Sequence, residues 1–166
     1  GLSEYSIAAS ASAIYQNDPV KALNTGTIGV AAAGDVLLGS LNGVFYTDAS
    51  TSKPTWSNHL EASNAATDIV GFVADDPYER FEIQSNNSGA SAQTDVFNDA
   101  DIAYAAGATP NFVSKVELDD ATLGATNGQL KIVGVSKDPD NNDLASANVN
   151  WVVIINEHFL KQVAGV

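Results

Sequence analysis

The most regular pattern of apolar and polar positions lies near the middle of the chain. Residues 69–74 form a continuous apolar run, short enough for a strand buried on both faces. In residues 80–84, Phe81 and Ile83 alternate with polar side chains, which indicates a half-buried strand with one solvated face. Two aspartates and Pro77 lie between these runs and are typical of a turn. The pattern therefore predicts a β-hairpin whose turn carboxylates are structural.

Further apolar segments of strand length recur along the chain. Turns rich in Gly, Asn, Asp and Pro separate them, at intervals of roughly 8–15 residues. The expected strands cover residues 20–23, 28–32, 113–118, 130–135 and 149–157. Residues 1–13 form either an arm or a weak edge strand, in which Tyr5 and Ile7 alternate with polar residues.

Two interpretations fit the segment around Asn42-Gly43. This dipeptide is the strongest short-range signal for a hairpin, which would join residues 36–41 to residues 44–47. Alternatively, Gly43 is a bulge within one long strand over residues 36–46. Both interpretations place the segment in a sheet.

One helix is predicted, over residues 94–106. Its first residue is a threonine suited to N-capping, its apolar residues share one side, and a glycine follows its end. A short helical turn is expected within residues 60–67. Residues 48–58 and 85–93 have the composition of irregular loops, and Trp56 is the one large side chain of the first.

These elements predict a single domain over residues 1–166. The expected fold is all-β and mainly antiparallel, either a sandwich or a small barrel, with one or two short helices. A chain of this length can bury most of its apolar surface around one core. No period of 20–50 residues repeats, which disfavours a solenoid or a propeller.

The net charge of the chain limits the classes of partner that it is expected to bind. Seven Lys and Arg residues face 20 Asp and Glu residues, which gives a formal net charge of −13. Such a surface repels nucleic acid phosphates and anionic lipid, so neither direct nucleic acid binding nor membrane binding is expected. The chain has no cysteine, which excludes disulfides and thiolate metal sites.

Candidate chemistry is sparse. His59 lies in a polar loop and His158 follows Glu157 at the end of a strand, but no local motif makes either part of a catalytic pair, so both are expected to be structural or surface residues. The Asp- and Asn-rich residues 138–143 suit calcium, but they lack the glycine and glutamate of an EF-hand, which favours a solvated turn. No phosphate loop, nucleophile elbow or zinc spacing is present. We therefore expect a protein that is not an enzyme and uses no cofactor or metal.

Three segments together resemble a known group of proteins. They are GDVLLGSLNGVFYTD at residues 34–48, IVGFVADDPYERFEIQ at 69–84, and VGVSKDPDNND at 133–143, continuing through His158. The pattern is similar to small virion structural proteins of tailed bacteriophages, including marine and cyanobacterial phages, that act as capsid decoration (cement) proteins. The resemblance implies a β-tulip-like fold and a place on the outer capsid surface of the virion. It also implies binding to a major capsid protein of the HK97-like fold, and a homo-oligomer, with a trimer favoured.

A decoration protein works through buried surface and needs no active site. The candidate interface residues are Tyr5 and Ile7 in the N-terminal segment, and Lys53, Trp56 and His59 in the later loop. Trp56 is the expected anchor, because buried aromatic side chains dominate the energetics of interfaces.

The alternative function is a carbohydrate- or calcium-binding β-sandwich module of a phage fibre or a bacterial surface protein. It would require exposed aromatic side chains on a groove, or a calcium loop at residues 138–143. Retention on a glycan array or calcium binding in calorimetry would favour this alternative.

Overall fold

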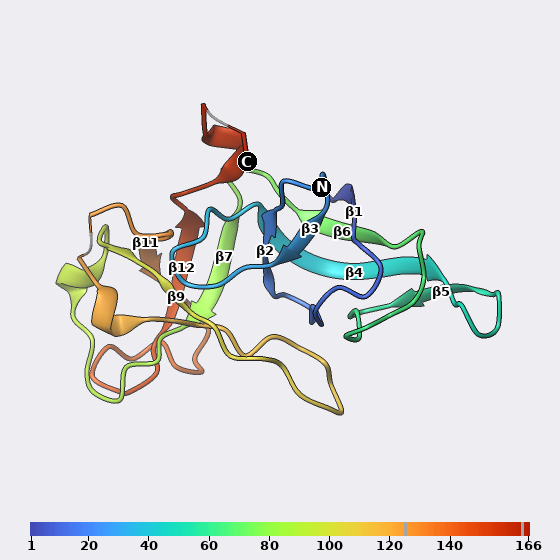
Figure 1. The fold of residues 1–166 in the computed structure, drawn as a ribbon. Coiled ribbons are helices and arrows are strands. Elements are labelled where there is room, and N and C mark those ends of the chain that lie inside the picture. Colours follow the sequence, from blue (N-terminus) through green and yellow to red (C-terminus); the bar gives the residue numbers. More distant parts are fainter. Residues whose placement is uncertain (125, 164) are drawn as a thin grey trace.

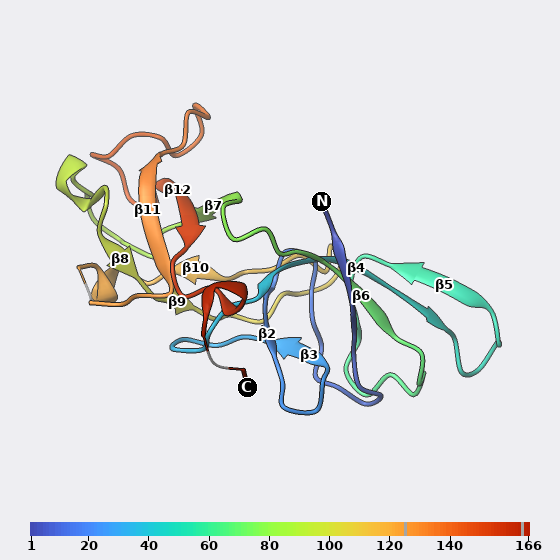
Figure 2. The same ribbon diagram turned by 90° about the horizontal axis from the view of Figure 1, so that it is seen from above.

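The regular secondary structure of the protein consists almost entirely of short antiparallel strands, which confirms the all-β prediction. The computed structural model describes residues 1–124, 126–163 and 165–166. The strands form two main sheets that lie side by side, with the N-terminal sheet at one end of the molecule and the C-terminal sheet at the other (Figures 1 and 2). The helices described are single 3-10 turns: η1 (Gln93–Asp95), η2 (Asp120–Thr122) and η3 (Phe159–Lys161).

The N-terminal sheet has six strands. They are β1 (Ser3–Ser6), β2 (Pro19–Ala22), β3 (Ile28–Val30), β4 (Gly39–Thr47), β5 (Pro54–Ser57) and β6 (Val70–Ala74). The order is β1-β6-β4-β2-β3, and β5 also pairs with β4. The long strand β4 therefore organises this sheet, because it pairs with β6 and, at successive positions, with β2 and β5.

The C-terminal half contains a four-stranded sheet and a two-stranded sheet. Its strands are β7 (Arg80–Gln84), β8 (Asp99–Ala100), β9 (Ile102–Ala103), β10 (Glu117–Leu118), β11 (Leu130–Val135) and β12 (Asn150–Ile155). The order in the larger sheet is β7-β12-β11-β8, and β9 pairs with β10. The predicted strands at 130–135 and 149–157 are confirmed, whereas only the last two residues of 113–118 form a strand.

The predicted hairpin of residues 69–84 is wrong in its pairing. Both strands exist, but β6 lies between β1 and β4, whereas β7 pairs with β12 in the other sheet. Residues 75–79 therefore cross between the sheets. Their turn chemistry is as expected, since Asp76 Oδ1 accepts a hydrogen bond from the Tyr78 amide at 2.9 Å. A crossover connection and a hairpin turn favour the same residue types, so the local sequence pattern could not distinguish between them.

The bulge interpretation of Asn42-Gly43 is confirmed. β4 is continuous, and its register against β6 shifts between Leu41 and Gly43. Because of this shift, Leu41 and Val44 are both fully buried although they are three positions apart.

The predicted helix over residues 94–106 is wrong. Only the 3-10 turn η1 forms, and Phe97 follows it with a φ of 77°, a left-handed conformation that a right-handed helix does not contain. The chain then enters β8 and β9. The expected helical turn within residues 60–67 is also absent, because these residues form irregular turns after Leu60 bridges to Ile14.

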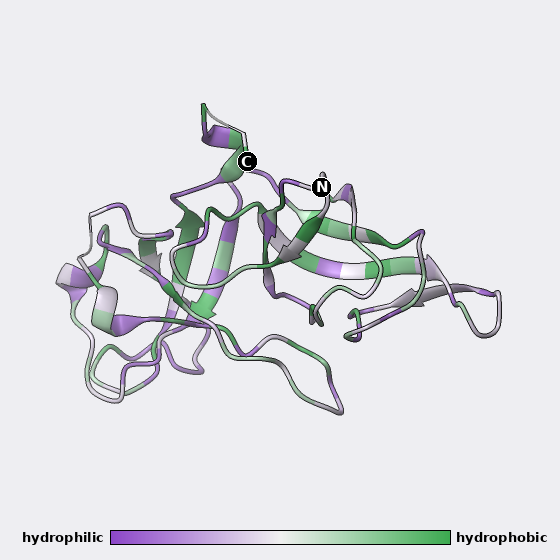
Figure 3. Ribbon diagram, in the orientation of Figure 1, coloured by the Kyte–Doolittle hydropathy of each residue, from purple (hydrophilic) through white to green (hydrophobic). Residues whose placement is uncertain are grey.

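Buried apolar side chains gather in two clusters, so the expectation of a single core is wrong. Figure 3 shows apolar residues concentrated along β12 and parts of β4 and β6, with polar residues in the connecting loops. The N-terminal cluster includes Ile14, Val20, Leu41, Val44, Leu60 and Val73. The C-terminal cluster includes Ile102, Leu118, Leu130, Ile132, Trp151 and Val153.

Each half contributes a segment to the other. Leu37 comes from the N-terminal half, yet it packs in the C-terminal cluster and donates its amide to the Glu157 carbonyl at 3.0 Å. The Phe159 amide donates a hydrogen bond to the Leu37 carbonyl at 2.7 Å, and the Phe159 side chain packs against the N-terminal cluster. The Ser114 amide likewise donates to Gln16 at 2.7 Å. The two halves are therefore held together by exchanged segments.

Candidate binding surface

One face of the N-terminal sheet packs on its cluster, and the opposite face is open. Alternate residues of a strand point to opposite faces, so the burial of Val44 and Val73 directs Phe45 and Phe72 outward. Trp56 lies directly opposite Phe45 in the β4–β5 register and shares the outer face. The apolar run at residues 69–74 predicts a strand buried on both faces. The structure corrects this, because only one face of β6 is fully buried.

Three aromatic side chains form a continuous apolar surface on this outer face. We call Phe45, Trp56 and Phe72 the aromatic patch. The ring centroids of Trp56 and Phe72 are 5.2 Å apart, and the rings are tilted by 52°. Trp56 is 54% exposed and Phe45 is 42% exposed, so the patch is open to solvent rather than part of a core.

The Trp56 ring packs directly against the backbone of Gly43. A Cβ atom at this position would lie 2.6 Å from the indole ring and 2.9 Å from the Ser57 carbonyl oxygen. Any other residue would displace the ring or the neighbouring strand. The absence of a side chain at Gly43 therefore allows the Trp56 ring to lie flat against the sheet.

Polar residues border the aromatic patch. Glu4 and Ser6 of β1 lie opposite Phe72 and Val70, so they share the outer face at its edge. An apolar centre with a polar rim is the usual arrangement of a protein interface. The patch is therefore the candidate binding surface.

Trp56 and Lys53 were expected in an irregular loop, and the structure corrects this for Trp56. Trp56 lies in β5, which pairs with β4. Lys53 is exposed immediately before β5, and its carbonyl oxygen accepts a hydrogen bond from the Asp48 amide at 2.9 Å. β4 and β5 thus form a hairpin with Lys53 at its turn.

Tyr5 and Ile7 lie on the inner side of the sheet, away from the patch. Tyr5 Oη donates to Asp75 Oδ2 at 2.6 Å, and burial together with this carboxylate raises the pKa of Tyr5 to about 12. Ile7 is 3% exposed and belongs to the N-terminal cluster, which removes its side chain from the candidate surface. The prediction that this segment forms an edge strand is confirmed, since β1 lies at one end of the strand order and pairs with β6, while Ile7 just beyond it makes an isolated bridge to Ile28.

His59 packs the loop after β5 against the loop that contains Phe112. Its ring stacks on Phe112 with centroids 3.9 Å apart and parallel planes. Its Nδ1 atom lies 2.8 Å from Asn58 Oδ1. The residue therefore has a packing role within the chain, as expected of a structural histidine.

His158 is fully buried where the exchanged segments meet. Its Nδ1 atom accepts a hydrogen bond from the Leu160 amide at 3.1 Å, whereas Nε2 has no partner among the described residues. Burial and the nearby Lys161 ammonium lower the pKa of His158. The neutral ring is thus favoured at neutral pH.

The acidic loop at residues 138–143 uses its carboxylates locally. Asp138 Oδ1 accepts a hydrogen bond from the Asp140 amide at 3.1 Å, and Asp143 Oδ1 accepts one from the Ala145 amide at 2.9 Å. Within the described residues, no group of three or more His, Cys, Asp or Glu side chains is arranged to hold a metal ion. The geometry fits a solvated turn.

Asp18 is a buried carboxyl group that sequence reasoning did not single out. Its Oδ2 atom accepts a hydrogen bond from the Tyr15 amide at 2.8 Å, and its Oδ1 atom has no partner in the described part of the chain. Burial raises the pKa of Asp18, although the Ser114 hydroxyl and the Tyr15 amide act in the opposite direction. Relative to the unfolded chain, the folded state therefore favours the protonated form of Asp18.

The substitution Asp18→Asn should stabilise the protein more at neutral pH than in acid. The raised pKa of Asp18 means that its contribution to stability is complete below the ordinary value of about 3.9 and is lost as the pH rises through the raised value. Asparagine keeps an acceptor for the Tyr15 amide and does not ionise. Urea denaturation of both proteins at about pH 3 and about pH 7 measures the effect. A stability difference that is equal at both pH values would contradict it.

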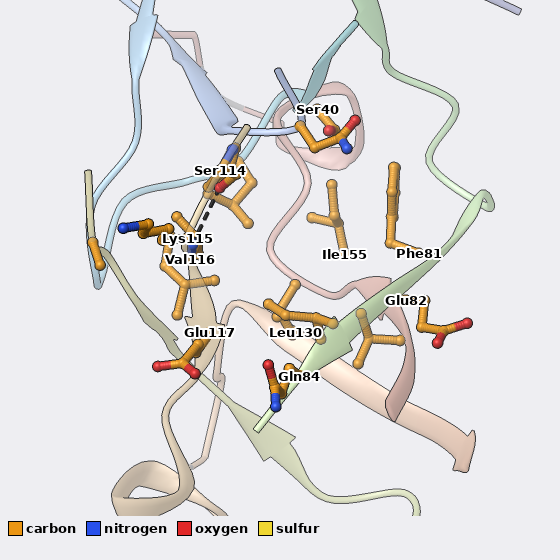
Figure 4. Close-up of a pocket in the computed structure, with 18 of the residues that line it drawn as sticks. Ser40, Phe81, Glu82, Gln84, Ser114, Lys115, Val116, Glu117, Leu130 and Ile155 are labelled. Carbon is orange, nitrogen blue, oxygen red and sulfur yellow. Dashed lines mark hydrogen bonds between the residues drawn. The ribbon is translucent and has the colours of Figure 1, made fainter. Parts of the chain in front are cut away.

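A cleft of about 820 Å³ lies between the two sheets (Figure 4). Phe81 and Ile83 of β7 line one side of the cleft, and residues 113–117 line the other. Ser40 of β4 lies at the end of the cleft next to the N-terminal sheet. Sequence reasoning did not predict this cleft, because its walls come from segments that are distant in the chain.

Sequence reasoning identified Trp56 but missed Phe45 and Phe72. Both phenylalanines lie in apolar runs and were assigned to buried strands. The available signal was the bulge at Asn42-Gly43: once Leu41 and Val44 both point inward, Phe45 must point outward.

Comparisons with protein-family models, with curated proteins and with solved structures found no match. No helix among the described residues is long and apolar enough to cross a membrane. Functional inference therefore rests on the geometry of this chain and on the resemblance described above.

Proposed function

We propose that the protein is a structural component of a bacteriophage virion that binds the outer surface of the icosahedral capsid. Its role is to stabilise the shell formed by the major capsid protein, without catalysis and without a cofactor. The observation that carries the proposal is the aromatic patch, in which Trp56 and Phe45 are exposed on a paired sheet. Exposed apolar patches with polar rims mark protein interaction sites.

The choice of partner follows from the resemblance to capsid decoration proteins. It supports a major capsid protein of the HK97-like fold as the partner and a homo-oligomer, with a trimer favoured. The net charge of −13 supports a partner surface that is basic or neutral around the apolar contact. Such a protein gains affinity from buried surface, and Trp56 is the larger and the more exposed of the two exposed rings in the aromatic patch.

Replacing Trp56 with alanine should weaken binding to capsids at least tenfold. Truncation of an interface hot spot costs about 2 kcal/mol or more, which corresponds to a larger than tenfold change in affinity. The measurement is co-sedimentation of the purified protein with phage heads from which the native copies have been removed, followed by quantification of occupancy.

Tyr78→Ala is the matched control for this experiment. Tyr78 is 80% exposed but lies on the crossover between the sheets, outside the aromatic patch. Its loss should leave occupancy unchanged. Equal occupancy by the Trp56→Ala variant and the wild-type protein would overturn the proposal.

The same aromatic patch favours a second candidate, the carbohydrate-binding module. Exposed aromatic rings held on a sheet can stack against sugar rings, as they can against protein. Retention of the wild-type protein on a glycan array, lost in Trp56→Ala and combined with no binding to heads, would support this alternative.

A further inference from the structure

Strand β7 has one edge that is unpaired along most of its length. On one side it pairs with β12 from Arg80 to Gln84. On the other side it meets β10 only beyond its last residue, where the Asn86 amide donates to the Leu118 carbonyl at 3.0 Å. From this point toward Arg80, the cleft lies between β7 and residues 113–117 (Figure 4).

The ladder between β7 and β12 shows which backbone groups face the cleft side. The Ser85 amide donates to the Val149 carbonyl at 2.9 Å, so these two residues form a hydrogen-bonded pair in the continued register. Such pairs alternate along antiparallel strands, so Gln84 and Glu82 direct their N–H and C=O groups away from β12. Asn150, opposite Gln84, agrees with this, because its amide donates to a loop carbonyl instead. In the described part of the chain, the amides of Glu82 and Gln84 have no backbone acceptor.

The floor of the cleft is apolar. The partly exposed apolar side chains of the cleft are Phe81, Ile83 and Val116, which are half-buried. The other apolar lining residues belong to the C-terminal cluster and are at most 4% exposed: Leu37, Ile102, Leu130, Val153 and Ile155. A strand laid along the five residues of β7 would extend for about 17 Å and direct alternate side chains onto this floor.

The end of the cleft at Gln84 continues into a group of carboxylates. Asn86 Nδ2 donates to Asp119 Oδ1 at 3.3 Å, and Asn86 Oδ1 accepts from the Asp120 amide at 2.9 Å. Burial and the charges of Asp95 and Asp119 raise the pKa of Asp120, which reflects how closely these carboxylates are gathered. This end, in a chain with net charge −13, complements a basic side chain.

We propose that the cleft binds an extended peptide segment of a partner protein as an additional strand on the open edge of β7. The segment carries apolar side chains at alternate positions, which pack against the half-buried Phe81, Ile83 and Val116, and Lys or Arg at the end near Asp119 and Asp120. Its backbone pairs with the free N–H groups of Glu82 and Gln84 and with the C=O group of Glu82, which is the β-augmentation mode of peptide recognition. This site is separate from the aromatic patch and does not depend on the capsid assignment.

The test uses a labelled synthetic peptide of alternating valine and threonine with a pair of lysines at each end. Fluorescence anisotropy should show saturable binding to the wild-type protein. The substitution Glu82→Pro should weaken this binding at least tenfold, because it removes an N–H that faces the cleft while leaving the bonds to β12 intact. Glu82→Ala is the matched control, since it removes the same side chain but keeps the amide, and it should bind as the wild type does.

A second measurement keeps the proposal testable if Glu82→Pro does not fold, as judged by circular dichroism and thermal unfolding. A peptide methylated on alternate backbone nitrogens, prepared in both phases of alternation, should bind the wild-type protein at least tenfold more weakly in one phase. Equal affinity of both methylated peptides and the parent peptide, or no saturable binding of the parent peptide, would overturn strand addition. Equal affinity of a peptide with glutamates in place of the lysines would overturn the basic end. The Trp56→Ala variant should bind the peptide normally, so the two proposals can fail separately.

Discussion

Replacing Trp151 with alanine is expected to lower the free energy of unfolding by about 3–5 kcal/mol. Trp151 is the largest fully buried side chain and lies in β12, between Ile83 of β7 and Val135 of β11. Its removal leaves a cavity at the centre of the C-terminal sheet, where paired strands on both sides prevent collapse. Urea denaturation monitored by far-UV circular dichroism measures the loss.

Trp151→Phe is the control that separates packing from hydrogen bonding. The indole Nε1 atom of Trp151 has no hydrogen-bond partner in the described part of the chain, so phenylalanine gives up no such bond. It also fills most of the same space. We therefore expect less than half of the loss seen with alanine. Equal losses for both variants would contradict the cavity explanation.

The substitution Gln129→Met should cost about 3 kcal/mol or more, because it leaves several buried groups unpaired. Gln129 is fully buried, and its Nε2 atom donates to the carbonyl oxygens of Ala32 at 3.0 Å and Asp35 at 2.6 Å. Its Oε1 atom accepts from the Ile102 amide at 3.1 Å. Methionine has similar volume but makes none of these bonds. Urea denaturation should show a shifted midpoint with an unchanged slope.

Gln129→Glu provides a pH-dependent companion to this prediction. The introduced carboxylate would face the carbonyl oxygens of Ala32 and Asp35, and burial would raise its pKa above the unfolded value. Stability should then be highest in acid, where the carboxyl group is protonated and can donate, and fall as the pH rises through the raised value. A Gln129→Glu variant whose stability relative to the wild type is independent of pH would contradict the proposed role of Nε2.

The positions of the main strands could be predicted from the sequence, whereas their partners could not. Alternation identified residues 80–84 because one face of β7 is buried, and this is a local property. The pairing of β7 with β12 depends on contacts with residues 150–154, which leave no trace in the local pattern. The helix over 94–106 failed for a similar reason, since the left-handed conformation of Phe97 depends on its bond to the Ile132 carbonyl.

The candidate surface was predicted in part. Trp56 stood out because it is the one large side chain in a polar segment, and it is the centre of the aromatic patch. Ile7 was chosen by its alternation with Tyr5, but alternation reveals a buried face and not which face meets a partner. The cleft beside β7 could not be predicted, because an unpaired edge is defined only once all strand partners are known.

The exchange of segments between the halves has a consequence for how the chain is made. Leu37 is synthesised before most of its neighbours in the C-terminal cluster and before Glu157 and Phe159, with which it shares hydrogen bonds. Contacts between such distant segments slow folding and expose unpaired strands in the meantime. The N-terminal sheet therefore lacks its contact with Phe159 until that residue has been synthesised. A nascent chain that stops short of Phe159 would leave both halves unfinished at once.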